Sequence, residues 1–340
     1  MKQLRKQLFF ILILFGSLDA SAGMTQRSDC FTSIARLGIE KYLSSESLFA
    51  RDKRIPKLLK EIDSQTPDID RYAQNFFNSN DKWPTIDQVK THMMKRFEKM
   101  DQSLAFLIKI SDPSSVRQLV GIRNQLKIAR ASIYNSFNPS LDSRIYKVGD
   151  RDLKFELIEF DYRFRGDLGE IESWYRTQNP VELNLLFNSS TRSTHPDLAN
   201  FQDKLVELKS KISKMSRAEI KRLRQLADPS LFKGIFTYKG VRKRMLQLLH
   251  DKEIDIVAEV DGGKLAFIEV KNYFVPLNDI QGTSLSKKPL ATQMEETRWV
   301  LRALGLEDQI ELGLVFTGSG IHPREARKLM SQSIRVYQTH

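Results

Sequence analysis

The chain has 340 residues, of which 41% are hydrophobic and 28% charged, and its formal net charge is +12. This length and composition are typical of a globular protein with room for two domains that each have a core. The single cysteine, Cys30, excludes an internal disulfide, so packing has to stabilise the fold.

The N-terminus has the pattern of a secretory signal. Three basic residues precede an apolar run from 8 to 18, and small residues follow up to Ala22. This order predicts export, to the periplasm or out of the cell, with cleavage after Ala22. An uncleaved anchor is the alternative, although the run is short for a membrane span. After cleavage we expect no stable membrane span and a net charge of +10.

Residues 23–228 are predicted to form an all-α helical bundle. Apolar residues recur there at helical spacing over three long segments, about 88–110, 115–137 and 153–175. We expect this domain to bind a protein partner that the sequence does not identify.

The end of this helical region is also marked by sequence signals. Apolar residues from Leu198 to Met215 step alternately by three and four, which indicates packing inside an antiparallel bundle. Ser216 and Glu219 form a capping box that starts a new helix. Asp228-Pro229 is predicted to close the helical domain, which leaves 229–340 as a second domain.

A basic stretch spans residues 209–244. It contains twelve Lys or Arg and only two carboxylates, so it accounts for the net charge of the mature chain. A concentration of positive charge suits a polyanion, because phosphate contacts release counterions. A solvated helix face is the alternative. The residues that we expect to bind nucleic acid are Lys221, Arg222, Arg224, Lys239, Arg242, Lys243 and Arg244.

Residues 253–271 are predicted to form a β-hairpin, because two β-rich runs flank an Asp-Gly-Gly turn. If Val260 pairs with Lys264 around a three-residue loop, one face of the hairpin is apolar throughout. The same register sets Asp255 opposite Glu269 on the other face, where Lys271 joins them. A two-residue loop would mix apolar and charged partners on both faces.

Further elements surround this hairpin. We expect a helix over about 239–250 before it, a helix over about 290–304 after it, a buried strand at 310–316 and a final helix near Pro323. The order predicts a mixed sheet flanked by helices.

An Asp on one strand and Glu-Val-Lys at the end of the next resemble the PD-(D/E)xK nuclease superfamily, over about 229–340. The resemblance implies a restriction-endonuclease-like domain in which Asp255 and Glu269 bind Mg²⁺, with Mn²⁺ as an alternative, and the Val270 carbonyl completes the metal shell. It implies that Lys271 is the catalytic lysine and that Gln293, in the following helix, fits a position that some branches use.

Two features depart from the family's pattern. Residues 229–250 contain no Asp or Glu, so Asp251 or Glu253 would have to replace the helix acid of many members, or the site uses fewer ligands. The domain is also one strand short, unless 235–238 supplies it.

The sequence gives no support to several other chemistries. No two of the five histidines are four residues apart, so a zinc site is not expected. A Gly-x-Ser-x-Gly elbow and a phosphate-binding Gly-rich loop are both absent.

We therefore predict an α+β chain, a helical bundle followed by a nuclease-like α/β domain, that acts as an exported, metal-dependent deoxyribonuclease with little sequence specificity. One alternative is a nucleic-acid-binding protein that keeps the fold without the activity. The other is an interaction protein whose helical bundle carries the function.

Overall fold

The computed structural model describes residues 54–137, 151–260, 263–272, 289–317 and 320–338. These residues fall into two compact units, one with the described residues up to Arg176 and the other with those from Thr177 on. The predicted secretory signal and Cys30 lie outside the described residues.

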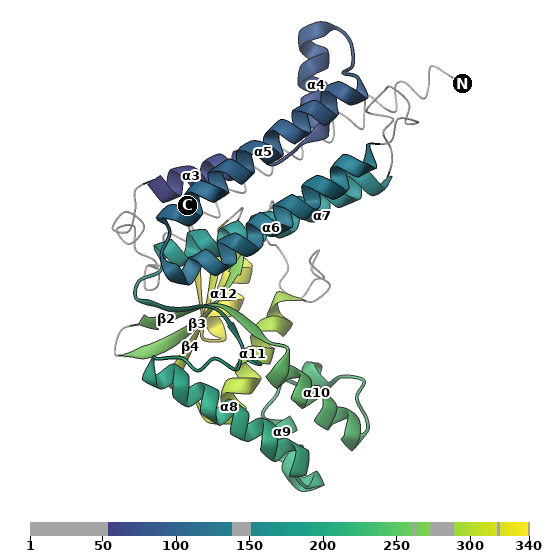
Figure 1. Ribbon diagram of the computed structural model, residues 1–340. Helices are drawn as coiled ribbons and strands as arrows, with labels where there is room; N and C mark the ends of the chain where they lie inside the picture. The colour runs from purple at the N-terminus through teal and green to yellow at the C-terminus, as the bar shows by residue number, and fades with distance from the viewer. Residues whose placement is uncertain (1–53, 138–150, 261–262, 273–288, 318–319, 339–340) are drawn as a thin grey trace, which may run out of the picture. The chain divides into compact units, whose positions relative to one another are not determined.

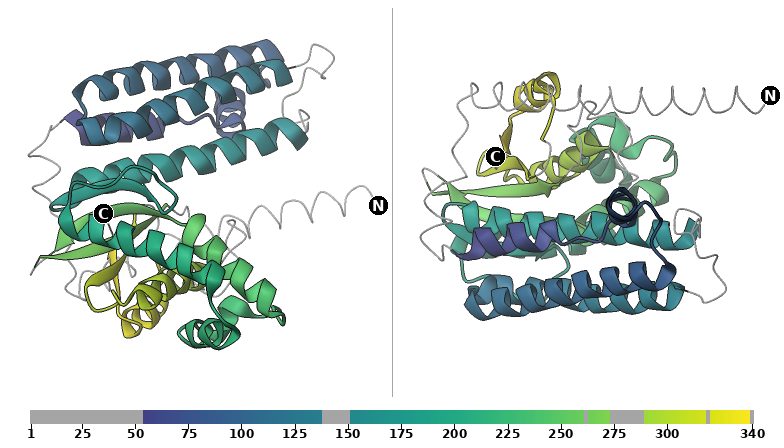
Figure 2. Two further views of the ribbon diagram at one scale, coloured as in Figure 1. Left: turned by 60° about the horizontal axis from the view of Figure 1, so that its bottom comes forward. Right: turned by 90° about the horizontal axis from the view of Figure 1, so that it is seen from above.

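The first unit is helical, as predicted. Its members are α3 (Arg54–Ser64), α4 (Ile69–Asn80), α5 (Ile86–Ile110), α6 (Pro113–Ser136) and α7 (Arg151–Arg176). The long helices α5, α6 and α7 lie side by side in chain order, with α3 against α5 and α7 (Figures 1 and 2). The apolar residues at helical spacing on α5 are fully buried, among them Met93, Phe97 and Met100.

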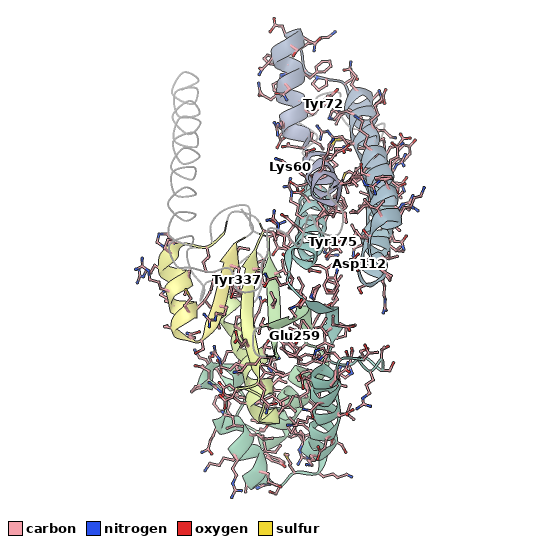
Figure 3. All side chains as sticks on the ribbon, turned by 90° about the vertical axis from the view of Figure 1, so that its left-hand side faces the viewer. Lys60, Tyr72, Asp112, Tyr175, Glu259 and Tyr337 are labelled. Carbon is pink, nitrogen blue, oxygen red and sulfur yellow. The ribbon has the colours of Figure 1, made fainter. Side chains whose placement is uncertain are left out.

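A polar cluster fixes the turn between α5 and α6 to the end of α7. The Tyr175 hydroxyl accepts the backbone N–H of Asp112 at 3.1 Å and lies 2.9 Å from the Ser115 hydroxyl. The Trp174 indole N–H donates to the Asp112 carboxylate at 3.2 Å. Figure 3 shows Tyr175 and Asp112 close together. Since these groups are largely buried, their hydrogen bonds avoid a desolvation cost.

The second unit contains a five-stranded mixed sheet. Its strands are β1 (Pro180–Leu186), β2 (Glu253–Val260), β3 (Lys264–Lys271), β4 (Ile310–Phe316) and β5 (Ile334–Gln338), and they lie in this order across the sheet. The pairs β1/β2 and β2/β3 are antiparallel, whereas β3/β4 and β4/β5 are parallel. The prediction of a mixed sheet is confirmed.

Helices flank this sheet. They are α8 (Pro196–Lys214), α9 (Arg217–Gln225), the 3₁₀ turn η2 (Pro229–Phe232), α10 (Tyr238–His250), α11 (Leu290–Leu304) and α12 (Pro323–Ser331). The helices α11 and α12 are the crossovers that join the parallel strands, which cannot be connected by a tight turn. Apolar side chains from all of these helices share one buried cluster with the sheet.

The predicted domain boundary at 228 lies inside this unit. Helix α8 packs on the sheet, since Phe201 meets Phe267 of β3 edge to face at 4.9 Å between ring centroids. The seam from Leu198 to Met215 is therefore buried against a sheet and not inside a helical bundle. A stripe of apolar residues shows which face of a helix is buried, but not what covers it.

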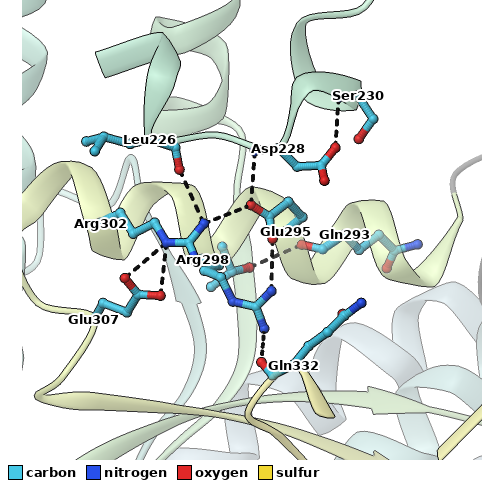
Figure 4. Close-up of polar contacts among 10 residues, drawn as sticks. Leu226, Asp228, Ser230, Gln293, Glu295, Arg298, Arg302, Glu307 and Gln332 are labelled. Atoms are coloured by element: carbon cyan, nitrogen blue, oxygen red, sulfur yellow. Dashed lines mark hydrogen bonds and ion pairs between the residues drawn. The ribbon is translucent and has the colours of Figure 1, made fainter. Parts of the chain in front are cut away.

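Helix α11 attaches the segment around 228 to the same unit. The Trp299 indole N–H donates to the Leu223 carbonyl at 3.0 Å, and the Asp228 N–H donates to Glu295 at 3.3 Å. Glu295 also pairs with Arg298 at 2.9 Å, and Arg298 donates to the Gln332 carbonyl (Figure 4). The residues on both sides of position 228 thus share one core.

Two strands differ from the prediction. The additional strand is β1, from a region predicted to be helical, and residues 235–238 are instead a loop and the start of α10. Strand β5 follows α12, where only a final helix was predicted. Strand β1 pairs with β2, and β5 pairs with β4 across α12, so both strands depend on pairing that local periodicity does not report.

Candidate active site

The β2–β3 hairpin has the predicted register. Val260 pairs with Lys264, Ala258 with Ala266, and Ile256 with Ile268. Gly263 has a φ of 72°, and its N–H donates to the Val260 carbonyl at 3.1 Å, which closes the three-residue loop. Glycine adopts this left-handed backbone without steric cost. The turn thereby fixes which side chains share a face.

Asp255, Val270, Glu269 and Lys271 meet at the end of the hairpin opposite to this turn. One carboxylate oxygen of Asp255 accepts the Val270 backbone N–H at 2.6 Å. Lys271 Nζ lies 2.7 Å from Glu269 Oε1, and both side chains are mostly buried. The two acids and the lysine that the sequence analysis selected are therefore neighbours.

These carboxylates open into a pocket of about 390 Å³. It is formed by the end of α10, the start of β2, the end of β3 and the first turns of α11. The lining residues are Arg244, Gln247, Leu248, Asp251, Lys252, Glu253, Asp255, Glu269, Gln293 and Glu296. Gln293 thus lines the same pocket as the two acids, together with Asp251 and Glu253.

Proximity of the acids affects their protonation. Burial and the nearby Glu269 carboxylate raise the pKa of Asp255 to about 7, and the Lys271 ammonium and the Val270 N–H oppose this rise. Partial burial and Glu269 also raise the pKa of Glu253. Crowded carboxylates hold protons that a bound cation would displace.

The donor atoms match a hard divalent cation, which prefers carboxylate and carbonyl oxygens. No three His, Cys, Asp or Glu side chains are arranged as a ready metal site in the part of the chain that the structure describes. A cation would have Asp255 and Glu269 as its side-chain ligands, and Glu253 lies in the same pocket. The predicted ligation by the Val270 carbonyl stays a prediction, since the contact seen here is made by its N–H.

An ion pair between Arg244, which was expected to bind nucleic acid, and Glu296, which was not predicted, forms part of the pocket wall. Arg244 Nη2 lies 2.7 Å from Glu296 Oε1, and the Glu296 side chain is only 3% exposed. Glu296 follows Gln293 by three residues, so the two lie on one face of α11. The spacing of three residues from Gln293 is the sequence signal that could have identified Glu296 as a pocket residue.

The basic residues divide into two groups. Lys221, Arg222 and Arg224 on α9, and Lys239 and Lys243 on α10, are exposed. Arg242 instead donates to the Met215 carbonyl and the Tyr238 hydroxyl, and Arg244 pairs with Glu296. The exposed group is thus the one available to a large polyanion.

Comparison with known proteins found no family model, no curated protein and no solved structure that matches this chain. Any proposal about function therefore rests on the fold and on the pocket.

Across the described ranges, no helix is both long and apolar enough to cross a membrane.

Proposed function

We propose that this protein is a metal-dependent nuclease of the PD-(D/E)xK type that hydrolyses phosphodiester bonds of DNA. The observation that supports this most is that Asp255 and Glu269, from one hairpin, line the same pocket, and that Lys271 pairs with Glu269. Together with the predicted secretory signal, the proposal describes an exported nuclease.

Each residue has a role in this proposal. Asp255 and Glu269 would hold Mg²⁺ or Mn²⁺, which would supply an activated water and neutralise phosphate charge. Lys271, an ammonium paired with Glu269, orients the attacking water and offsets the negative charge that develops on the phosphate. Gln293, on α11, lines the same pocket, and an amide is a group that can donate to a phosphate oxygen.

The exposed basic residues on α9 and α10 support a nucleic acid as the substrate. Contacts to phosphates are independent of the base sequence, so little sequence specificity is expected. Helix α10 carries both basic residues and pocket residues, which connects the binding surface to the reacting groups.

The test is incubation of the purified mature protein with circular DNA, linear DNA and RNA, in Mg²⁺, in Mn²⁺ and in excess chelator. The proposal predicts DNA cleavage with either metal and none in chelator, and nicking of circles identifies an endonuclease. Cleavage that persists in chelator, or no cleavage of any substrate, contradicts it.

One observation favours a second candidate, a protein that binds nucleic acid without cutting it. No side-chain trio in the described residues is preformed for a metal, and the ammonium of Lys271 already occupies one oxygen of Glu269. This candidate predicts salt-sensitive DNA binding that is the same in Mg²⁺ and in chelator, with no product in either.

A further inference from the structure

Phe236 is 93% exposed, which is unusual for a large aromatic side chain. It lies in the loop between η2 and α10, between Lys233 and Lys239. Isolated exposed apolar residues are common on protein surfaces. Phe236 differs from such a residue because its backbone is held in place and because it directly precedes a helix that lines the pocket.

The backbone around Phe236 is firmly held. The Ile235 N–H donates to the Phe232 carbonyl at 3.1 Å, and Ile235 packs against the core of the sheet unit. The Thr237 hydroxyl accepts the Gly240 N–H at 3.1 Å and so caps α10. A Cβ on Gly240 would lie only 2.9 Å from side-chain atoms of Ile235 and Thr237, so this turn is closely packed. The loop thus presents Phe236 to solvent on a fixed support.

Two lysines and a glutamine form a row on one face of α10, which follows Phe236 in the sequence and carries pocket residues. Lys239, Lys243 and Gln247 are exposed and follow one another at intervals of four residues on α10, so they share one face. Gln247 lines the pocket that holds Asp255 and Glu269. Residues 229–250 include no Asp or Glu, so no carboxylate of this segment neutralises the row.

The row has the length of a short nucleic-acid segment. Positions 238 to 247 of α10 are nine residues apart, which corresponds to roughly 14 Å along the helix, and Phe236 lies two residues before the helix begins. At about 3.4 Å per stacked nucleotide, this helical part is roughly four nucleotides long. A strand with its reacting phosphate at the pocket would therefore reach Phe236 a few nucleotides away.

We propose that Phe236 is a base-stacking residue for a DNA strand with unpaired bases, whose phosphates lie along Lys239 and Lys243 and whose scissile phosphate lies at the pocket. The inference rests on the proposed function and adds its substrate class. Aromatic faces stack on unpaired bases, whereas the faces of paired bases are covered within a duplex. Single-stranded or frayed DNA is then bound more tightly than intact duplex.

The alternative use of an aromatic residue among lysines is attachment to an anionic membrane. Such attachment uses a helix with a free apolar face. On α10, Val241, Met245, Leu248 and Leu249 are buried, and Tyr238 and Leu246 are partly buried against the same core, so α10 offers no such face. The direct path to the acidic pocket also favours a nucleic acid.

The experiment measures affinity in chelator, so that no cleavage occurs. Labelled single-stranded and duplex 20-mers are titrated with wild type, Phe236→Ala, Phe236→Trp and Val206→Ala. Val206 is the control, because it is apolar, 65% exposed and on α8 of the same unit. Circular dichroism checks that each variant is folded.

We expect Phe236→Ala to weaken single-strand binding by about 5- to 100-fold, the range for loss of one stacked base. Duplex binding should change by less than about threefold, and Phe236→Trp and Val206→Ala should bind the single strand as the wild type does.

Equal single-strand affinities for wild type and Phe236→Ala overturn the inference. The inference is also overturned if Phe236→Ala loses affinity only for phosphatidylserine vesicles and not for single-stranded DNA. A wild type that cleaves nothing in metal, while Phe236→Ala still loses single-strand binding, counts against the proposed chemistry alone and leaves the stacking role in place.

Discussion

Asp255 is one of two carboxylates that the hairpin brings together at the end opposite to its turn. Its neighbours in the strand, Ile254 and Ile256, are buried, and its own carboxylate accepts the Val270 N–H at 2.6 Å. This contact holds the carboxylate beside Glu269, and the repulsion between them contributes to the raised pKa. The repulsion between the two carboxylates is unfavourable, and a cation bound between them would reduce it.

The first prediction concerns the pH dependence of stability in metal-free protein. The raised pKa, about 7, means that folded Asp255 keeps a proton that the unfolded chain releases near pH 4. The contribution of Asp255 to the free energy of unfolding is therefore fully present below about pH 4 and is lost as the pH rises to about 7. Asp255→Asn should make the decline between about pH 4 and about pH 7 shallower, as measured by urea unfolding in chelator. An unchanged decline contradicts the assigned protonation.

The second prediction concerns Lys271. Lys271→Met removes the ammonium next to Glu269, and we expect kcat to fall by about 10²- to 10³-fold, as for loss of one charge-stabilising donor. Lys264→Met is the matched control, since Lys264 lies at the other end of β3 and donates to the Asp308 carbonyl. Similar losses in both variants would show that the effect is structural.

At the scale of elements, the hairpin could be predicted and two strands could not. Its register follows from short-range information, because only one loop length separates apolar from charged partners. Strand β1 pairs with β2 about seventy residues later, and its register shifts between Pro180 and Glu182. Its segment also contains Asn184 with a φ of 55°, which departs from a regular strand. Neither the distant partner nor the irregularity leaves a local periodic signal.

The difference between local and long-range information also explains which residues of the candidate site could be predicted. Asp255, Glu269 and Lys271 could be selected because strand alternation puts them on one face. The Arg244–Glu296 pair joins α10 to α11, which are separated by the whole hairpin, so only the folded unit brings it together.

The third prediction tests where the sheet unit begins. A fragment of residues 177–340 includes β1, α8 and α9, whose apolar residues belong to the shared core. We expect this fragment to unfold cooperatively on heating, whereas residues 229–340 should not, because they lack the edge strand and the helix packed on Phe267. Circular dichroism during heating compares the two. A cooperative transition in the shorter fragment would support a boundary at 228.

At the scale of the whole molecule, the positive charge is concentrated in residues 209–244, which belong to the sheet unit and contribute to the wall of its pocket. This concentration of charge is the reason to expect a polyanionic ligand. It did not show which basic residues are exposed, since Arg242 and Arg244 make internal contacts.

The fourth prediction uses salt dependence. Each lysine that contacts a phosphate of single-stranded DNA contributes about 0.7 to the slope of log K against log salt. Lys239→Ala with Lys243→Ala should therefore lower the slope for single-stranded DNA by about 1.4. Lys57→Ala with Lys60→Ala, at exposed positions of α3 in the helical unit, makes the same charge change and should leave the slope unaltered. Equal slopes in both double variants would contradict contact along α10.

The most direct test of the account is cleavage of circular DNA in Mg²⁺ by the wild type, Glu269→Gln and Glu259→Gln. Glu259 is on the same hairpin, with its side chain 46% exposed, and it does not line the pocket, so its variant controls for the loss of one carboxylate. The account predicts cleavage by the wild type and by Glu259→Gln and none by folded Glu269→Gln. Cleavage by Glu269→Gln at the wild-type rate would contradict the assigned site.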